Sequence, residues 1–302
     1  MVDAAQPLAG RAPSPLTYGG MSQWRVGDVS ITRVIEVENA FRGTWLLPDA
    51  TPEAVREVDW LRPLFAEEQG RLRMSAHSLV VRSGGLTILV DTGIGNDKDR
   101  PAVPGWHQRR GSFLADLAAA GFPRESIDRV VCTHLHADHV GWNTMLDDGR
   151  WVPTFPNARY LFVRSEYEHW LADESVQDGP FADSVRPVVD AGLVEWTDPD
   201  ARITDQVFLQ PSFGHTPGHV CVRVSDGGEE AVVTGDLMHH PVQCARPDWA
   251  TTFDVDADTA RAVRQEFLQR HAGTSTLVFG THFATPSAGH IVRDGAAWRF
   301  DC

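Results

Sequence analysis

The sequence predicts an α/β protein in which two β-sheets are sandwiched between layers of helices. Predicted strands come first in hairpins and then alternate with helices through both halves of the chain. No linker and no short-period repeat interrupts the 302 residues. Hydrophobic residues make up 42% of the chain and charged residues 23%, an ordinary globular composition that can bury a large core. We therefore expect a single domain over residues 25–302.

Residues 1–24, ahead of this domain, are expected to form a flexible arm. They are rich in Ala, Pro and Gly and have no periodic apolar pattern. Residues 28–37 alternate between apolar and polar types and are rich in β-branched side chains, which predicts a strand. Residues 39–75 are irregular and aromatic, with Thr51 and Pro52 as a helix start. A loop-like stretch of this length is typical of a lid or a pocket flap.

The following segments carry clear strand and helix signals. Residues 78–81 and 86–90 are apolar runs separated by Gly84 and Gly85, which predicts a hairpin. Residues 112–120 have helical spacing and stop at a glycine. Further strands are expected over residues 129–133, 160–163, 207–209, 220–224, 231–234 and 276–279, further helices over residues 164–171, 181–191 and 256–271, and a last hairpin over residues 288–293 and 297–300.

The charge balance excludes several classes of partner. The chain has 27 Lys and Arg against 41 Asp and Glu, a formal net charge of −14, and no basic run. This balance argues against binding to nucleic acid or to an anionic membrane surface. No apolar stretch approaches the roughly 18 residues that a membrane span needs, and residues 1–20 lack the layout of a secretory signal. The four cysteines form no C-x-x-C pair, which indicates free thiols in a cytoplasmic protein.

Histidines are concentrated directly after the strand predicted over residues 129–133. The stretch His134-Leu135-His136-Ala137-Asp138-His139 places three imidazoles and a carboxylate within six residues. A loop at the end of a strand can bring such side chains together, whereas a regular helix or strand would spread them. Imidazole nitrogen and carboxylate oxygen are the ligands that Zn²⁺ and similar cations take. The stretch therefore predicts a metal site.

Three later segments repeat this arrangement. Gly214 to His219, Thr234-Gly235-Asp236 and Gly280-Thr281-His282 each follow an apolar strand. Ligand-type residues at the ends of several strands should meet on one rim of the sheets, where binding sites tend to form.

These motifs resemble those of the metallo-β-lactamase fold hydrolases. His134 to His139 matches the H-x-H-x-D-H signature of that family, and the later motifs match in order, from about residue 28 to the C-terminus. The resemblance implies a four-layer αβ/βα sandwich of two mixed sheets with two metal ions on its rim, most readily Zn²⁺, with Fe, Mn or Co as alternatives. It assigns His134, His136 and His215 to one metal, Asp138, His139 and His282 to the second, and Asp236 as the bridge between them. It also implies that Asp91 and His219 support the ligands by hydrogen bonds instead of binding metal.

The implied chemistry is hydrolysis. Two dications that share a carboxylate and a water molecule lower the pKa of that water, so a bridging hydroxide can attack a carbonyl or phosphoryl centre near neutral pH. Asp236 would hold this centre together, and Asp138 would carry a proton to the leaving group. No Gly-x-Ser-x-Gly motif is present, which disfavours a covalent serine mechanism.

Within this family, the sequence favours a lactonase, such as those that open acyl-homoserine lactones. An organophosphate triester or aryl ester hydrolase of the methyl-parathion-hydrolase type is the alternative on the same centre. An alternative of another class is a metal-binding sensor without turnover, which the full set of seven ligand-type residues disfavours. Some lactonases carry a Tyr three residues after the bridging Asp, where this chain has His239.

Aromatic residues near the motifs suggest an apolar substrate pocket. The chain has 10 Trp, several of them in predicted loops. Such walls suit a small hydrophobic lactone or ester. We expect Trp142, His239, Phe41, Trp45 and Trp60 to line the pocket. The oligomeric state stays open, a homodimer included.

Overall fold

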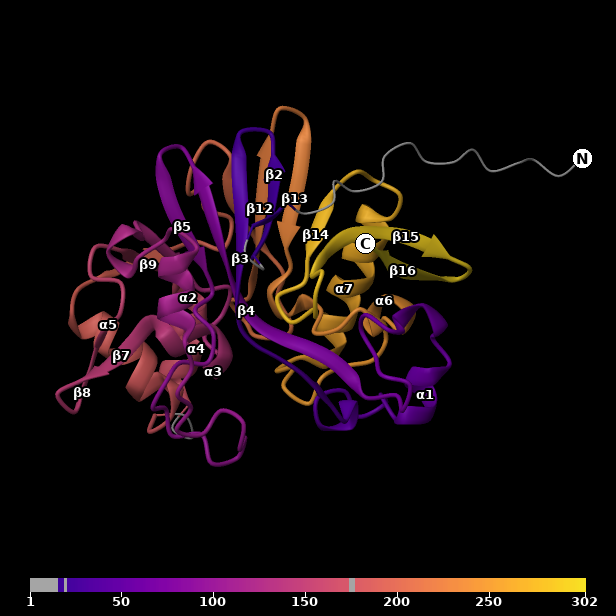
Figure 1. Cartoon of the computed structure of the whole chain (residues 1–302), viewed down its shortest axis with the longest axis horizontal. Coiled ribbons are helices and arrows are strands. Elements are labelled where there is room, and N and C mark those ends of the chain that lie inside the picture. The colour runs from indigo at the N-terminus through magenta and orange to yellow at the C-terminus, as the bar shows by residue number, and fades with distance from the viewer. Residues whose placement is uncertain (1–15, 19–20, 174–176) are drawn as a thin grey trace, which may run out of the picture.

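The computed structural model describes residues 16–18, 21–173 and 177–302, and it contains two large sheets side by side between helices (Figure 1). The eight-stranded sheet has the order β1-β2-β3-β4-β5-β6-β9-β10, and the six-stranded sheet the order β11-β12-β13-β14-β15-β16. Both sheets are mixed, because β5, β6, β9 and β10 pair in parallel in the first, as do β13 and β14 in the second. The predicted α/β sandwich is confirmed.

The strands and helices have the following bounds. The first sheet contains β1 (Leu16–Tyr18), β2 (Met21–Val26), β3 (Val29–Phe41), β4 (Leu72–Ser83), β5 (Leu86–Val90), β6 (Arg129–Val131), β9 (Arg159–Val163) and β10 (Val194–Thr197). The second contains β11 (Val207–Pro211), β12 (Val220–Asp226), β13 (Glu229–Val233), β14 (Leu277–Phe279), β15 (Ala288–Asp294) and β16 (Ala297–Asp301), and a separate hairpin pairs β7 (Thr144–Asp147) with β8 (Arg150–Pro153). The α-helices are α1 (Pro52–Arg56), α2 (Phe113–Ala119), α3 (Ala137–Val140), α4 (Arg164–Ala172), α5 (Arg186–Asp190), α6 (Val242–Ala245) and α7 (Ala257–His271).

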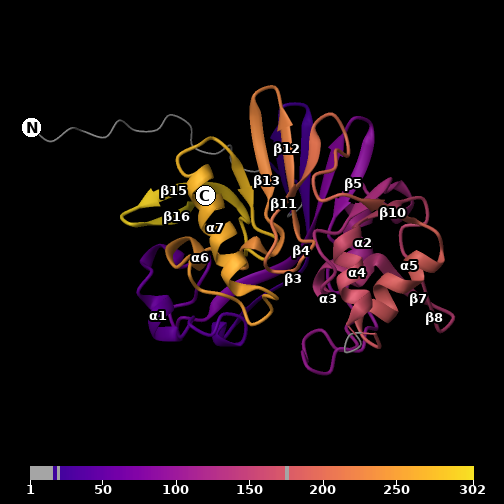
Figure 2. The same ribbon diagram turned by 180° about the vertical axis from the view of Figure 1, so that it is seen from behind.

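The layers follow from the alternation of side chains along the strands. In β4, Leu79 and Val81 face the core between the two sheets, whereas Val80 faces an outer core. That outer core packs under α2 and α5, and a third core packs under α7 on the other side. Figures 1 and 2 show α2, α4 and α5 flanking one sheet and α6 and α7 flanking the other. Both faces of both sheets are therefore apolar, which explains the short, β-branched strands of the sequence.

The N-terminal region differs in part from the predicted arm over residues 1–24. Residues 1–15 and 19–20 lie outside the described residues. Residues 16–18 and 21–24, however, belong to β1 and β2, which pair with each other and then with β3. The reason is Trp24, which is buried and packs edge-on against Phe279 at 5.0 Å between ring centroids, so β2 contributes to the core between the sheets.

The segment predicted as a lid, residues 39–75, packs as a flap against the second half of the chain. It contains α1, where the Thr51 side chain accepts a hydrogen bond from the amide of Ala54, as expected for the predicted helix start. Leu47, Leu61 and other flap residues are buried in the same core as α7. Residues 181–191, predicted as one helix, form a π-helical turn (Phe181–Val185) that runs into α5. Among the described helices, none has the length and apolar character required to cross a membrane.

Candidate metal centre

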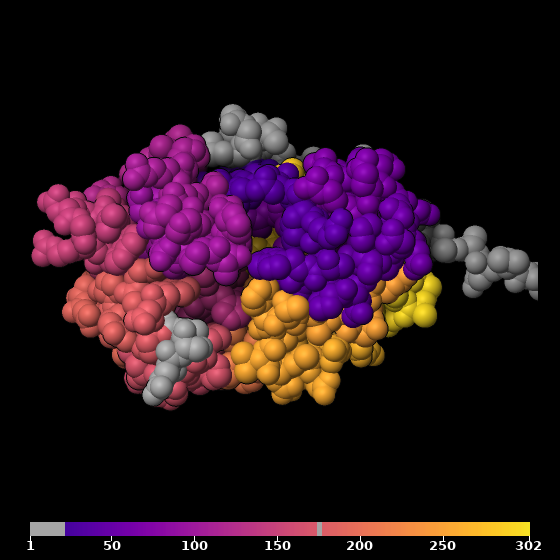
Figure 3. Space-filling model, turned by 90° about the horizontal axis from the view of Figure 1, so that it is seen from below, coloured from indigo at the N-terminus to yellow at the C-terminus, as the bar shows by residue number. Residues whose placement is uncertain are grey.

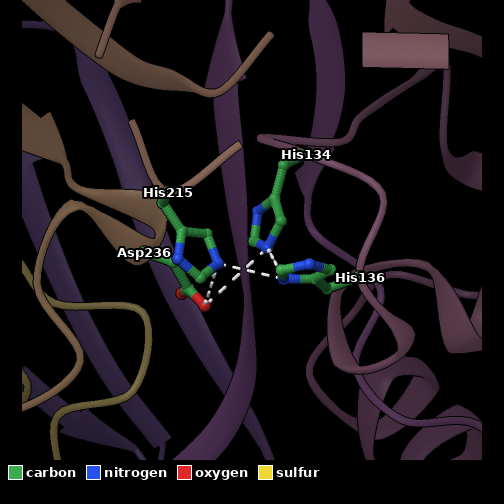
Figure 4. A group of neighbouring side chains, drawn as sticks. All are labelled: His134, His136, His215 and Asp236. Atoms are coloured by element: carbon green, nitrogen blue, oxygen red, sulfur yellow. Dashed lines mark hydrogen bonds and ion pairs between the residues drawn. The ribbon is translucent and has the colours of Figure 1, made fainter. Parts of the chain in front are cut away.

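The predicted ligand-type residues of four segments meet where the two sheets come together. His134 follows β6, and Asp138 and His139 lie in the short helix α3. His215 lies in the loop between β11 and β12, and His282 follows β14. Figure 4 shows His134, His136, His215 and Asp236 pointing toward one common point.

Two groups of potential ligand atoms result, each with its atoms within 4.8 Å of one another. We call His134, His136, His215 and Asp236 the first cluster, and Asp138, His139 and His282 the second cluster. In the first cluster, His136 Nδ1 lies 3.0 Å from His134 Nε2 and 2.9 Å from His215 Nε2. In the second, His139 Nε2 lies 3.2 Å from His282 Nε2. These spacings are short enough for one cation to contact all members of each cluster.

Asp236 lies between the clusters and turns one carboxylate oxygen toward each. Its Oδ2 is 3.4 Å from His215 Nε2 and 3.7 Å from His134 Nε2. Its Oδ1 is 3.1 Å from His282 Nε2 and 3.3 Å from His139 Nε2. Although buried, Oδ1 has no hydrogen-bond partner among the described residues. A buried carboxylate oxygen left in this state fits a bound cation.

Hydrogen bonds behind the histidines fix which ring nitrogen faces inward. The Nδ1–H of His139 donates to Asp91 Oδ2 at 2.8 Å, that of His215 to Asp254 Oδ1 at 2.9 Å, and that of His282 to the carbonyl of Ser75 at 3.1 Å. Each acceptor is an oxygen without a hydrogen, so Nδ1 must carry the proton and Nε2 presents its lone pair. Two such lone pairs only 3.2 Å apart repel unless a proton or a metal ion lies between them. The donor set thus fits divalent cations of the zinc type.

The pKa shifts of the clustered histidines are also those expected of a cation site. Burial would lower the pKa of His139, but the carboxylates of Asp236 and Asp91 outweigh burial and hold it well above the ordinary value. Burial and the neighbouring imidazoles lower the pKa values of His134, His136 and His215 well below the ordinary range. The carboxylates thus favour the protonated form of His139 in the absence of metal, and a bound cation would compete with that proton.

Asp91 and His219 lie directly behind the clusters. Asp91 has a positive φ of 55° and accepts hydrogen bonds from the amide and hydroxyl of Thr133 as well as from His139. His219 Nε2 accepts the backbone N–H of Asp236 at 2.8 Å, and His219 Nδ1 donates to Ser212. Both nitrogens of His219 are thus engaged, so this ring holds the backbone of Asp236 instead of offering a free lone pair.

A cavity of about 940 Å³ opens above the clusters, and Figure 3 shows it as a hollow with the magenta part of the chain on one side and the indigo flap and the orange segment on the other. Asp138, Asp236 and His239 contribute to its floor. The walls are largely apolar and aromatic, and they include Phe41, Trp45, Met74, Trp106, Trp170 and Phe253. The predicted pocket residues Phe41, Trp45 and His239 therefore line the cavity.

Trp142 and Trp60, which the sequence also places in the pocket, do not line it. Trp142 is buried behind the site, where its indole Nε1 donates to Glu36 at 2.9 Å and its ring stacks on Phe113. The turn after α3 directs this side chain into the outer core. Trp60 packs on the core under α7, on the far side of the flap. Neither side chain points into the cavity, because closeness along the chain does not fix the direction of a side chain.

Several functional candidates were not predicted from the sequence. Asp254 and Ser75 accept hydrogen bonds from clustered histidines. Trp106, Trp170 and Phe253 stand in the cavity wall but in segments that carry no motif. A carboxylate 39 residues from the histidine it contacts gives no local signal, so only the fold reveals it.

Comparison with known proteins agrees with the geometry. A family model described as the metallo-beta-lactamase superfamily matches residues 72–292. No curated protein matches the chain. Among solved structures, AidC, described as a dizinc quorum-quenching lactonase, shares 22% identity at a TM-score of 0.78, over 93% of this chain and 96% of that chain.

Two further structures share this fold. The hydrolase AbOPH of the beta lactamase superfamily has 25% identity and a TM-score of 0.77, with 95% of this chain and 98% of that chain covered. A probable metal-dependent hydrolase from Staphylococcus aureus has 19% identity and a TM-score of 0.72, with 92% and 98% covered. Because the family model spans most of the chain, from β4 to β15, the chain belongs to the metallo-beta-lactamase superfamily.

Proposed function

We propose that this protein is a metal-dependent lactonase that opens lactones bearing an apolar acyl arm. The observation that carries the proposal is the cavity of about 940 Å³, which has aromatic walls and ends on the two clusters. An acyl lactone has the matching shape, with a polar ester at one end and an apolar chain at the other. AidC, which shares the fold, is described as a lactonase and was solved with a product bound, which supports the choice of substrate class.

The clusters suit two Zn²⁺ ions, one held by His134, His136 and His215 and one by Asp138, His139 and His282, with Asp236 between them. When bound, such ions polarise a carbonyl oxygen and make a water molecule more acidic.

The protein's own residues supply orientation and proton transfer. Asp236 holds the two halves in register, since each of its oxygens faces a different cluster. Asp138 is 15% exposed at the cavity floor and lies 3.5 Å from His282, which places its carboxylate where it can pass a proton to the leaving group. Addition of water to the lactone carbonyl forms a new C–O bond and releases a proton, and collapse of the tetrahedral adduct then breaks the ring C–O bond. The alkoxide that leaves takes up that proton and becomes a hydroxyl group.

His239 is another polar residue at the floor of the cavity. Its Nε2 lies 3.1 Å from Asp236 Oδ2, and its ring packs 4.9 Å from that of His215, between ring centroids. We place it beside the reacting ester, where it restrains Asp236 and shapes the space for the lactone ring.

A substrate panel tests the proposal. Lactones with short, medium and long N-acyl chains, a p-nitrophenyl ester and a dialkyl aryl phosphotriester are incubated with Zn²⁺-loaded protein, with chelator-treated protein as the control. Lactone opening that depends on metal and improves with chain length is expected. No turnover of any lactone by fully loaded protein would refute the lactonase, and turnover of the phosphotriester or aryl ester alone would assign the alternative activity.

The alternative activity, hydrolysis of a phosphotriester or aryl ester, rests on one observation. Trp45 contacts Trp106 and Phe253 edge-on at ring-centroid distances of 6.5 and 5.3 Å, and such a wall also suits an aryl leaving group. A sensor without turnover would bind Zn²⁺ and hydrolyse no member of the panel.

A further inference from the structure

Glu166 of α4 is a buried carboxylate outside the motifs and outside both clusters. It is 1% exposed, and the structure shows no ion pair to it among the described residues. Burial raises the pKa of Glu166, and hydrogen bonding by the Thr216 hydroxyl, the Trp170 indole and two backbone amides opposes that rise. Placing an unpaired charge in the interior is unfavourable, so this residue needs a reason to be there.

Its hydrogen bonds join three parts of the candidate site. Oε1 accepts the backbone N–H of Leu135 at 3.1 Å, and Leu135 stands between His134 and His136. Oε2 accepts the backbone N–H of Gly218 at 2.9 Å, in the loop that carries His215. One carboxylate thus ties together the two loops that provide all three histidines of the first cluster.

The third bond reaches the cavity wall. The indole N–H of Trp170 donates to Glu166 Oε1 at 2.7 Å, and the Trp170 ring lies against the His136 ring at 5.2 Å between centroids. Trp170 lines the cavity. Glu166 therefore fixes an aromatic wall residue and the first cluster at the same time.

The contact at Gly218 is too close for any side chain. A Cβ atom added at Gly218 would lie 2.5 Å from the backbone nitrogen and the Cβ of Glu166. No positive φ is required at this position, so the need for glycine comes from the approach of the loop to α4 and not from the backbone conformation.

We propose that Glu166 is a positioning residue that sets the separation of the His134–His136 and His215–His219 loops and thereby the cation affinity of the first cluster. The proposal rests on the proposed two-cation site but not on the proposed substrate. It predicts that loss of Glu166 weakens one of the two cations selectively, because its bonds reach the loops of the first cluster.

Glu166→Gln is the direct perturbation. All three partners of Glu166 are donors, whereas a carboxamide has one accepting oxygen and one donating NH₂ group. In at least one contact, two hydrogen-bond donors must therefore face each other, while the size and shape of the side chain stay the same. Gly218→Ala is a second variant that pushes the same loop away from α4 without a change of charge.

Two Gln substitutions serve as matched controls. Glu36 is also a buried carboxylate that accepts two backbone amides, from Ile94 and Gly95, and one indole N–H, but its partners lie outside the loops of the first cluster. Glu168 is an exposed glutamate of the same helix α4. Glu36→Gln shows how the loss of a buried carboxylate elsewhere affects Zn²⁺ affinity. Glu168→Gln shows how a change of charge on α4 alone affects it.

The Zn²⁺ affinity of each cluster is measured in a variant that has lost a ligand of the other cluster. In a His282→Ala background, only the first cluster should retain Zn²⁺, and in a His136→Ala background only the second. Zn²⁺ dissociation constants are measured by competition with a chelating dye, and urea unfolding of the metal-free protein measures stability.

In the His282→Ala background, Glu166→Gln and Gly218→Ala should each weaken Zn²⁺ about 10–100-fold, the range found when support behind a ligand is lost. In the His136→Ala background, the same changes should leave the Zn²⁺ affinity within about twofold, as should both control substitutions in the His282→Ala background. An unchanged Zn²⁺ affinity in folded Glu166→Gln, or equal losses in both backgrounds, would overturn the proposal. Absence of lactone turnover would leave these outcomes readable, since none of them depends on the substrate.

Discussion

Replacement of Asp254 by Asn tests whether the carboxylate behind His215 controls cation binding. Asp254 Oδ1 accepts the Nδ1–H of His215 at 2.9 Å, and Oδ2 accepts the backbone N–H of Thr251 at 3.1 Å. Both partners donate, whereas an Asn side chain offers one acceptor and one donor. One of the two contacts must therefore bring two donors together. The Nδ1–H of His215 then either meets the carboxamide NH₂ group or keeps only a neutral acceptor in place of the carboxylate.

The magnitude follows from the burial of this carboxylate. The Asp254 side chain is fully buried, and the fully buried guanidinium of Arg264 lies 3.9 Å away. Loss of one hydrogen bond to a charged acceptor costs about 1.5–3 kcal/mol, so the free energy of unfolding of the metal-free protein should fall by about 2 kcal/mol. Loss of a hydrogen bond behind a metal-binding histidine weakens the cation about 10–100-fold. The expected change in Zn²⁺ binding free energy at the first cluster is thus about 1.4–2.8 kcal/mol.

Zn²⁺ titration against a chelating dye measures the affinity, and urea unfolding in the presence of a chelator measures stability. Asp256→Asn is the matched control, because Asp256 is the exposed cap of α7 and bonds to Thr259 within its own helix. The control should leave Zn²⁺ affinity unchanged. If Asp254→Asn lowered stability but bound both Zn²⁺ ions within twofold of the wild type, the carboxylate would be purely structural and the reasoning would be refuted.

Two further predictions concern the site and its cavity wall, and a third concerns the buried Lys98 outside them. Asp236→Ala should remove both metal and activity, as measured by metal analysis and lactone hydrolysis, because it lies between both clusters; unchanged metal content would contradict the bridging position. Trp45→Ala should raise KM for long-chain lactones by up to about 30-fold, since covering the 46% of Trp45 that is exposed contributes about 2 kcal/mol. Trp60→Ala, outside the cavity, should lower stability and leave KM unchanged. If Trp45→Ala and Trp60→Ala changed KM equally, the place of Trp45 in the substrate-binding wall would be contradicted. Burial lowers the pKa of Lys98 to about 7, so the folded protein holds fewer protons there than the unfolded chain between pH 7 and about 10.5. Stability should therefore rise with pH across this window by about 1.4 kcal/mol per unit from this group, and Lys98→Met, compared by urea unfolding at several pH values, should remove that slope. An identical slope in the variant would show that Lys98 titrates normally.

Part of both clusters could be approached from sequence because four of their residues form a local signal. His134, His136, Asp138 and His139 lie within six residues, and no helix or strand accommodates that pattern as core. His215, Asp236 and His282 are each weak alone, but each follows an apolar strand, and strand ends share a rim. The two sheets could be predicted for a similar reason, since short β-branched runs with turn residues between them are readable over five to ten positions.

Only part of the cavity wall could be approached in this way, since Phe41 and Trp45 line the cavity as expected, whereas its assembly from distant segments could not be predicted. It joins the flap at Trp45, the loop at Trp106 and the segment at Phe253, and these aromatic contacts span more than 200 residues of sequence. No property of any one of these segments reports that the others lie beside it. Trp142 shows the converse error, because it follows His139 by three residues yet turns into the outer core toward Glu36.

The residues that hold the metal-binding loops in place are equally hard to predict from sequence, and helix α4 shows why. Glu166 and Glu168 are two glutamates in one charged stretch of α4, and nothing in the local sequence separates them. Residues two positions apart on an α-helix point in nearly opposite directions, so one of the pair must face inward if the helix packs at all. The buried member can be Glu166 because two backbone N–H groups converge on it from loops that are distant in sequence, and the indole N–H of Trp170 joins them from the next turn of the same helix. A carboxylate in such a place marks where the fold holds its loops together, because its two backbone partners are brought to it by the topology and not by the helix that carries it.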